Sequence, residues 1–115
     1  MTKIDLSYLA GVTDGDKEIM GEMIDLILEE TPIHLQNIVE FMENKEWKKL
    51  GAEAHKVKPL FLYVGLTELK DLAQEIEQFG KTEENLDQIP SLIEKLELGF
   101  NEIQSKLTDQ KELLA

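Results

Sequence analysis

Apolar residues recur at alternating intervals of three and four along most of this chain. This spacing places them on one face of an α-helix, and the two-residue alternation of a half-buried β-strand does not stand out. The sequence therefore predicts five helices, at about residues 4–10, 16–44, 46–64, 67–79 and 86–107. Four long amphipathic helices joined by short loops favour an all-α fold, an antiparallel up-down four-helix bundle with a short N-terminal helix. We expect residues 1–115 to form one domain.

Individual residues set the expected helix ends and faces. Gly65 is expected to end the helix at 46–64 and Gly80 the next one, because glycine readily adopts the left-handed conformation that stops a helix. Ile19 is expected on the buried side of the helix at 16–44. Residues 108–115 are expected to fray, as chain ends commonly do.

Composition narrows the class of protein. The net charge of −12 argues against binding to nucleic acid or to an anionic membrane surface. The absence of cysteine excludes disulfides and thiol chemistry, and it fits the reducing cytoplasm. No run of residues approaches a membrane-spanning length, and the N-terminus lacks the pattern of a secretory signal. We therefore expect a cytoplasmic protein that does not bind a membrane.

The helix at 46–64 carries a histidine on the side opposite its apolar stripe. The stripe consists of Trp47, Leu50, Ala54, Val57, Phe61 and Val64. His55 points roughly 140° away from the centre of this stripe, so we expect an exposed ring in the middle of a helix. The residues stacked around it are Gly51, Ala52, Lys58, Pro59 and Leu62. Two of these are small, and they should leave room beside the imidazole.

Lysines gather around this histidine although the whole chain is acidic. The segment 45–58 holds five lysines and two glutamates, a local charge of +3. Lys48 and Lys58 lie within side-chain reach of His55. A positive island of this kind suits the handling of an anion. Helix lysines also often only solvate the outer face, and both interpretations stay open for the lysines alone.

The segment AHKVKPLFLYVGLTEL closely resembles the signature of histidine phosphotransfer (HPt) domains, written H-x-L-K-G-x5-G-x3-L. His55 matches the phospho-accepting histidine and Lys58 the lysine. The apolar second position, the later glycine and the final leucine are matched by Val57, Gly65 and Leu69. Pro59 departs from the pattern, because the family usually has a small residue there.

The resemblance implies a phosphorelay carrier rather than an enzyme that uses ATP. His55 would accept a phosphoryl group from the aspartate of a receiver domain and pass it to another receiver, and Lys58 would stabilise the added charge. The partners would be response-regulator receiver domains and a hybrid sensor kinase. We expect a monomer without cofactor or metal. Lys48, Gly51, Ala52, Pro59 and Leu62 would dock the receiver or clear space for the phosphate.

Two positions leave alternatives open. In the resembled family a polar residue of the next helix, often Gln, lies near the histidine, and Glu77 takes that position here. A carboxylate would hold the ring N–H, but it would also repel a phosphate. Pro59 would either narrow the space for phosphate or form an apolar docking surface with Leu62. The alternative function is a pseudo-HPt adaptor that docks a receiver or another signalling protein without carrying phosphate, and a purely structural bundle is a third hypothesis.

Other site chemistries find little support in the sequence. His34 follows Pro32 in a segment whose nearby charges are glutamates, so we interpret it as a partly exposed histidine without a catalytic role. The chain contains no Glu-x-x-His or His-Glu-x-x-His pattern, which argues against di-iron bundles and zinc proteases. The glycine-rich phosphate loops of kinases and NTPases are also missing from the sequence.

Overall fold

The computed structural model describes residues 3–114, and these residues form helices and connecting turns without a β-strand. The helices are α1 (Ser7–Val12), α2 (Lys17–Glu43), α3 (Trp47–Tyr63), α4 (Thr67–Thr82) and α5 (Ile89–Leu114), and a short 3-10 helix, η1 (Leu86–Gln88), precedes α5. The predicted all-α class is confirmed.

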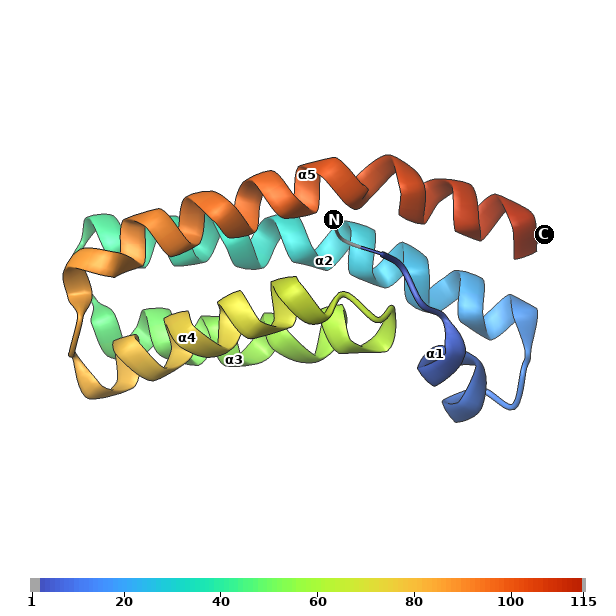
Figure 1. The fold of residues 1–115 in the computed structure, drawn as a ribbon, viewed down its shortest axis with the longest axis horizontal. Coiled ribbons are helices and arrows are strands. Elements are labelled where there is room, and N and C mark those ends of the chain that lie inside the picture. Colours follow the sequence, from blue (N-terminus) through green and yellow to red (C-terminus); the bar gives the residue numbers. More distant parts are fainter. Residues whose placement is uncertain (1–2, 115) are drawn as a thin grey trace.

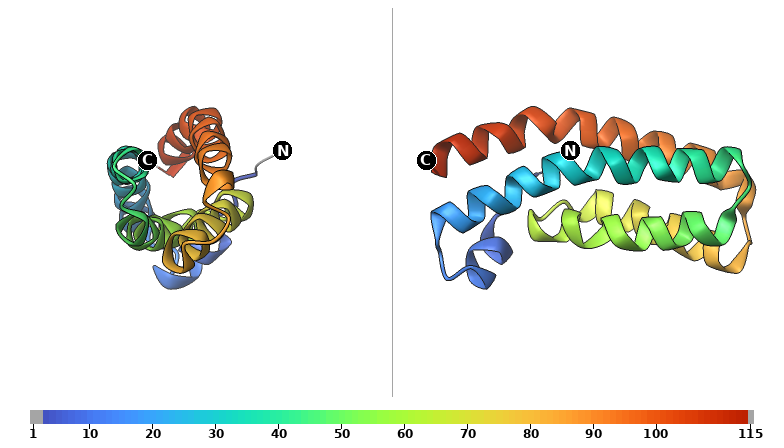
Figure 2. Two further views of the ribbon diagram at one scale, coloured as in Figure 1. Left: turned by 90° about the vertical axis from the view of Figure 1, so that its left-hand side faces the viewer. Right: turned by 180° about the vertical axis from the view of Figure 1, so that it is seen from behind.

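The four long helices form a ring in which each packs against its neighbours in the sequence. α2 packs on α3, α3 on α4, α4 on α5, and α5 closes the ring against α2. Successive helices run in opposite directions along a body of 43 × 23 × 22 Å (Figure 1). Seen end-on, the four helices surround a common centre (Figure 2). This is the expected antiparallel up-down bundle, and α1 packs across one end of it next to α3.

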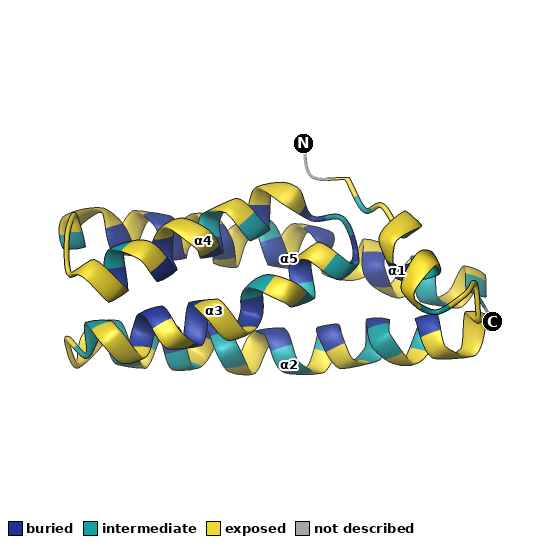
Figure 3. Cartoon of the chain, turned by 90° about the horizontal axis from the view of Figure 1, so that it is seen from below, coloured by how far each residue is buried: buried dark blue, intermediate teal, exposed yellow. Residues whose placement is uncertain are grey.

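The core is built from the apolar stripes read from the sequence. Buried positions line the inward faces of the helices and exposed positions the outward faces (Figure 3). Leu50, Val57 and Phe61 have no exposed surface, as expected for α3. Ile19 is different, because it is 44% exposed rather than buried. Its neighbour Met20 takes the inward position instead, and one residue along a helix turns the side chain by about 100°.

Several helix ends differ from their expected positions. α1 begins at Ser7, whose N–H donates to the Asp5 carboxylate at 2.9 Å, and it continues past the expected end at residue 10. α4 does not stop at Gly80 but continues to Thr82, and the left-handed residue that follows is Glu83. α5 begins at Ile89 after the 3-10 turn.

The expected fraying after residue 107 was wrong within the described part of the chain, where α5 continues to Leu114. Tertiary contacts explain this extension. Lys111 Nζ lies 2.7 Å from Asp25 Oδ1 on α2, and Leu114 packs against the core at half-buried exposure. The first turns of α2 extend beyond α3 and α4, and the last turns of α5 lie beside these first turns of α2 (Figure 1).

Gly51 on α3 and Gly80 on α4 let these two helices approach closely. A Cβ at Gly80 would lie 2.7 Å from the Trp47 carbonyl oxygen and 2.9 Å from the Gly51 nitrogen. A Cβ at Gly51 would lie 3.0 Å from the Glu77 carbonyl oxygen. All three contacts are to backbone atoms, which cannot rotate away as a side chain can. Gly80 therefore serves helix packing rather than helix termination.

Within the described residues, none of the helices combines the length and the apolar character needed to cross a lipid bilayer.

We predict that Gly80→Ala destabilises the protein by about 1–3 kcal/mol, because the added methyl group forces α3 and α4 apart. Gly21→Ala in α2 is the matched control, since a Cβ there meets nothing within 4 Å. The control should stabilise the protein by up to about 1 kcal/mol through helix propensity alone. Urea unfolding followed by circular dichroism measures both free energies. Equal effects of the two substitutions would show that the glycine contact does not limit helix packing.

Candidate functional site

His55 lies in the middle of α3 with its side chain 61% exposed. The buried stripe beneath it, with Ala54 and Val57 at no exposure, fixes the helix on the core and turns the ring outward. The expected exposure of His55 is therefore what the structure shows.

Glu77 of α4 is the hydrogen-bond partner of the His55 ring. Its Oε2 lies 2.9 Å from His55 Nδ1, and its side chain is only 7% exposed. An ionised carboxylate can only accept a hydrogen bond, so Nδ1 must carry the proton and donate. The other ring nitrogen, Nε2, has no partner among the described residues. In the neutral ring, this nitrogen therefore presents its lone pair away from Glu77.

Two lysines complete the surroundings of Glu77. Lys58 Nζ donates to Glu77 Oε1 at 2.8 Å and to Gln74 Oε1 at 2.8 Å. Lys81 Nζ donates to Glu77 Oε2 at 2.6 Å. Burial raises the pKa of Glu77, but the hydrogen bonds from Lys58, Lys81 and His55 outweigh this effect and lower the pKa from 4.5 to about 2. Glu77 is thus ionised at any physiological pH.

Helix geometry brings these side chains together. His55 and Lys58 are three residues apart on α3, so they lie on adjacent positions of one helix face. Glu77 and Lys81 are four residues apart on α4, which gives them the same relation. The close contact at Gly51 and Gly80 then presses the two faces against each other. We call His55, Lys58, Gln74, Glu77 and Lys81 the histidine cluster.

The remaining residues that the sequence suggested for this site have different surroundings. Lys48 is exposed and lies 3.8 Å from Glu83, so its described partner is not in the histidine cluster. Gly51 is buried. The space left by its missing side chain is filled by the backbone of α4 and does not lie open beside the His55 ring. Ala52, Pro59 and Leu62 are exposed on α3, and Leu62 is 47% exposed.

Lys81 and Gln74 belong to the cluster but were not singled out from the sequence. A signal for both exists once Glu77 is assigned to the face of α4 that meets His55. Lys81 follows Glu77 by four residues and Gln74 precedes it by three, so both lie on the same helix face. The sequence alone does not show which polar residues of α4 face His55, because apolar periodicity identifies only the buried stripe.

His34 shares one feature with His55, a buried glutamate at Nδ1. Glu53 Oε2 lies 2.6 Å from His34 Nδ1 and also accepts from Asn37 at 3.2 Å. Burial raises the pKa of Glu53, but the hydrogen bonds from His34 and Asn37 outweigh it and lower the pKa. The ring of His34 is only 17% exposed, compared with 61% for His55. His34 therefore links α2 to α3 and offers little open surface.

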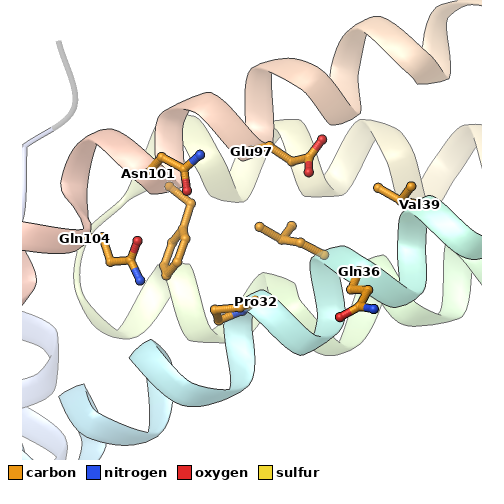
Figure 4. Close-up of a pocket in the computed structure, with 8 residues that line it drawn as sticks. Pro32, Gln36, Val39, Glu97, Asn101 and Gln104 are labelled. Atoms are coloured by element: carbon orange, nitrogen blue, oxygen red, sulfur yellow. The ribbon is translucent and has the colours of Figure 1, made fainter.

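A separate pocket lies between α2 and α5, and His55 does not line it (Figure 4). Its lining residues are Pro32, Leu35, Gln36, Val39, Glu97, Phe100, Asn101 and Gln104. Across residues 3–114, no group of three or more His, Cys, Asp or Glu side chains is arranged to hold a metal ion.

We predict that Glu77→Gln lowers the free energy of unfolding by about 2–3 kcal/mol at neutral pH, because the depressed pKa of Glu77 stabilises the folded state. The folded pKa, about 2, lies below the ordinary 4.5, so this stabilisation is present above pH 4.5 and is lost as the pH falls towards 2. The difference in the free energy of unfolding between wild type and Glu77→Gln should therefore become smaller below about pH 4.5. Urea unfolding at several pH values measures it.

Glu75→Gln is the matched control for this measurement, since Glu75 is exposed on the same helix. Its effect on stability should stay small at every pH. A Glu77→Gln effect that is equally small, or that does not change with pH, would contradict the assigned role of the buried carboxylate.

Comparisons with known proteins agree on one family. The family model described as "Hpt domain" matches residues 22–106. The phosphorelay intermediate protein rdeA of Dictyostelium discoideum is 26% identical over 109 residues, which cover 95% of this chain and 42% of that protein. This chain thus spans less than half the length of that relative.

Solved structures share the fold at low sequence identity. The histidine-containing phosphotransfer protein B (HptB) of Pseudomonas aeruginosa PAO1 superposes with a TM-score of 0.86 at 19% identity, covering 95% of this chain and 94% of HptB. A putative histidine-containing phosphotransfer protein from rice gives 0.73 at 17% identity, covering 95% and 76%. Since the family model covers well over half of the sequence, this chain belongs to the Hpt domain family.

Proposed function

We propose that this protein is a phosphorelay carrier, which accepts a phosphoryl group on His55 from the aspartate of one receiver domain and passes it to another. The observation that carries the proposal is the exposed imidazole with Nδ1 held by Glu77 at 2.9 Å and Nε2 left open. A neutral imidazole nitrogen with an available lone pair is a competent nucleophile towards phosphorus. The buried carboxylate fixes which nitrogen is available.

The transfer requires only a nucleophile and charge stabilisation from this chain. The Nε2 lone pair attacks phosphorus, and the bond from phosphorus to the aspartyl oxygen breaks with its electron pair left on the receiver carboxylate. Lys58 supplies positive charge one turn along α3 from the acceptor. The receiver would provide Mg²⁺ and the acidic pocket, so the proposed carrier needs neither ATP nor a cofactor of its own.

The relatives support this proposal through their names. One is called a phosphorelay intermediate protein, and two solved structures are called histidine-containing phosphotransfer proteins. The proposed partners are response-regulator receiver domains and a hybrid sensor kinase. We propose that the protein binds them as a monomer in the cytoplasm. Ala52, Pro59 and Leu62 are exposed on the helix of His55, and we propose that they dock the receiver.

The second candidate is an adaptor that docks a receiver without carrying phosphate. The observation in its favour is Pro59, which is exposed one turn after His55 where the family pattern has a small residue. Its ring adds apolar bulk next to the ring of His55. Phosphotransfer assays distinguish the two candidates.

We predict that His55→Gln abolishes labelling by a phosphorylated receiver, whereas His34→Gln does not. Glutamine keeps polarity and much of the size of histidine but lacks the nucleophile, and His34 is too enclosed to meet a receiver. The measurement is transfer of radioactive phosphate from a panel of phospho-receivers, scored as acid-labile and alkali-stable label. Circular dichroism confirms that both variants are folded.

Acid-labile label that persists on the folded His55 variant would place the acceptor elsewhere. A wild-type protein that binds a receiver but takes no label across the whole panel would favour the adaptor. In that case Pro59→Gly should be the first variant examined for restored labelling.

We predict that Lys58→Ala keeps the fold and slows phosphotransfer several-fold. One charge near the acceptor in a partly exposed site contributes about 1 kcal/mol to the transition state, which corresponds to a several-fold change in rate. Single-turnover transfer kinetics measure the effect. Lys106→Ala is the control, because Lys106 is exposed on α5 outside the histidine cluster. Unchanged kinetics in Lys58→Ala would remove this lysine from the mechanism.

A further inference from the structure

Glu77 is an unusual neighbour for a histidine that receives an anion. Its carboxylate is buried, ionised and only 2.9 Å from the acceptor ring. A negative charge at that distance opposes the arrival of a phosphoryl group. The same charge, however, favours a positive charge on the ring itself, and the balance of these two effects depends on the protonation state of the phosphorylated histidine.

Building on the proposed function, we propose that Glu77 keeps Nδ1 of His55 protonated after Nε2 has been phosphorylated, so that the phosphoryl group can leave without any proton reaching the ring first. Glu77 is then a positioning residue for the departure of the phosphoryl group as well as for its arrival.

The electron and proton balance of the two transfers explains why this matters. When neutral His55 attacks through Nε2, the ring keeps its Nδ1 proton and becomes a phosphorylated imidazolium. When an acceptor oxygen attacks phosphorus, the Nε2–P bond breaks and its electron pair returns to Nε2, which leaves neutral imidazole. If Nδ1 had lost its proton, the leaving group would instead be an imidazolate anion, which is far more basic and a much poorer leaving group.

The contacts of Glu77 suit this role. Its Oε2 accepts from His55 Nδ1, so the imidazolium charge forms beside a carboxylate that is already in place. Lys81 donates to the same oxygen at 2.6 Å and Lys58 donates to Oε1 at 2.8 Å, so the orientation of the carboxylate is fixed by contacts to both of its oxygens. The site therefore stabilises the cationic ring without needing to reorganise.

The charges of the cluster also balance. Glu77 on α4 is the titratable group described in contact with the ring, Lys58 on α3 and Lys81 on α4 contact Glu77, and α2 and α5 contribute no titratable group to these described contacts. With a neutral ring, the two lysines and the glutamate leave the cluster with one positive charge. Phosphorylation adds one positive charge on the ring and two negative charges on the phosphoryl group, so the phosphorylated cluster is neutral overall.

The state of the carboxylate is fixed across the relevant pH range. Hydrogen bonds from the lysines and from His55 outweigh the effect of burial and hold the pKa of Glu77 at about 2. Glu77 is thus ionised whenever the ring is charged. A neutral amide at this position would accept the same hydrogen bond but would lack the charge that favours the imidazolium.

The test uses the chemically phosphorylated protein, so it does not depend on a receiver. Wild type, Glu77→Gln and the control Glu75→Gln are treated with phosphoramidate, a small phosphoryl donor, and the release of inorganic phosphate from the purified phosphoprotein is followed from about pH 5 to pH 9. We expect the wild type and the control to retain fast release to higher pH. Glu77→Gln should release phosphate at a similar rate near pH 5 and about tenfold more slowly near pH 8.

A second measurement needs no substitution. Nitrogen-15 NMR of the phosphorylated wild type should show phosphorus on Nε2 and a proton on Nδ1 at about pH 8. Loss of the Nδ1 proton at that pH, or identical pH profiles for wild type and Glu77→Gln, would overturn the inference.

The outcome separates this inference from the proposed relay function. Glu77-dependent release together with no transfer to any receiver would support the inference and defeat the relay. Efficient transfer to receivers, together with the same pH profile of phosphate release in wild type and Glu77→Gln, would support the relay and overturn the inference. A folded wild-type protein whose His55 takes no label either from phosphoramidate or from any phosphorylated receiver would overturn both.

Discussion

The close approach of α3 and α4 is the constraint on which the site depends. Gly51 and Gly80 face each other where the two backbones leave no space for a Cβ. At this separation the Glu77 carboxylate lies within hydrogen-bond distance of His55 Nδ1. A side chain at either glycine would separate the helices and lengthen that bond. The chemistry of the histidine is therefore coupled to backbone packing one turn away from it.

Burial of a carboxylate is costly, and this structure offsets the cost locally. Removing an ion from water costs several kcal/mol unless partners replace the lost hydration. Glu77 receives hydrogen bonds from His55, Lys58 and Lys81, so both of its oxygens are occupied. Three donors from two helices also join α3 to α4 through one residue. The same contacts that stabilise the charge thus fix the orientation of the ring.

Much of this architecture follows from the sequence, because the apolar stripes of four long helices leave little choice of fold. The exposure of His55 follows from its angle to the stripe of Leu50, Val57 and Phe61. What failed were inferences that need a neighbouring helix. Gly80 was predicted to end its helix, but it is a packing position against α3. The end of α5 was predicted to fray, but Lys111 forms an ion pair with Asp25 on α2.

Polar residues were predicted less well for a related reason. Lys81 and Gln74 lie on a face of α4 that apolar periodicity does not mark, and only the position of α3 reveals that this face meets the histidine. Lys48 illustrates the same limit from the other side. Its spacing from His55 suggested a role near the ring, but its described partner is Glu83 at the end of α4. Spacing along one helix predicts the direction in which a side chain points, whereas the residues of the neighbouring helix determine which contact it makes.

The two histidines show that a buried carboxylate does not by itself make a site. His34 and His55 both place Nδ1 against a buried glutamate, at 2.6 and 2.9 Å. Both pairs connect α3 to a neighbouring helix, so both contribute to the packing of the bundle. They differ in the second ring nitrogen, because the His34 ring is largely enclosed and the His55 ring stands in solvent. They differ also in charge, since two lysines share Glu77, whereas the described partners of Glu53 are His34, Asn37 and, at 3.8 Å, Lys56. The same pairing thus yields an enclosed link between helices at one position and an exposed imidazole at the other.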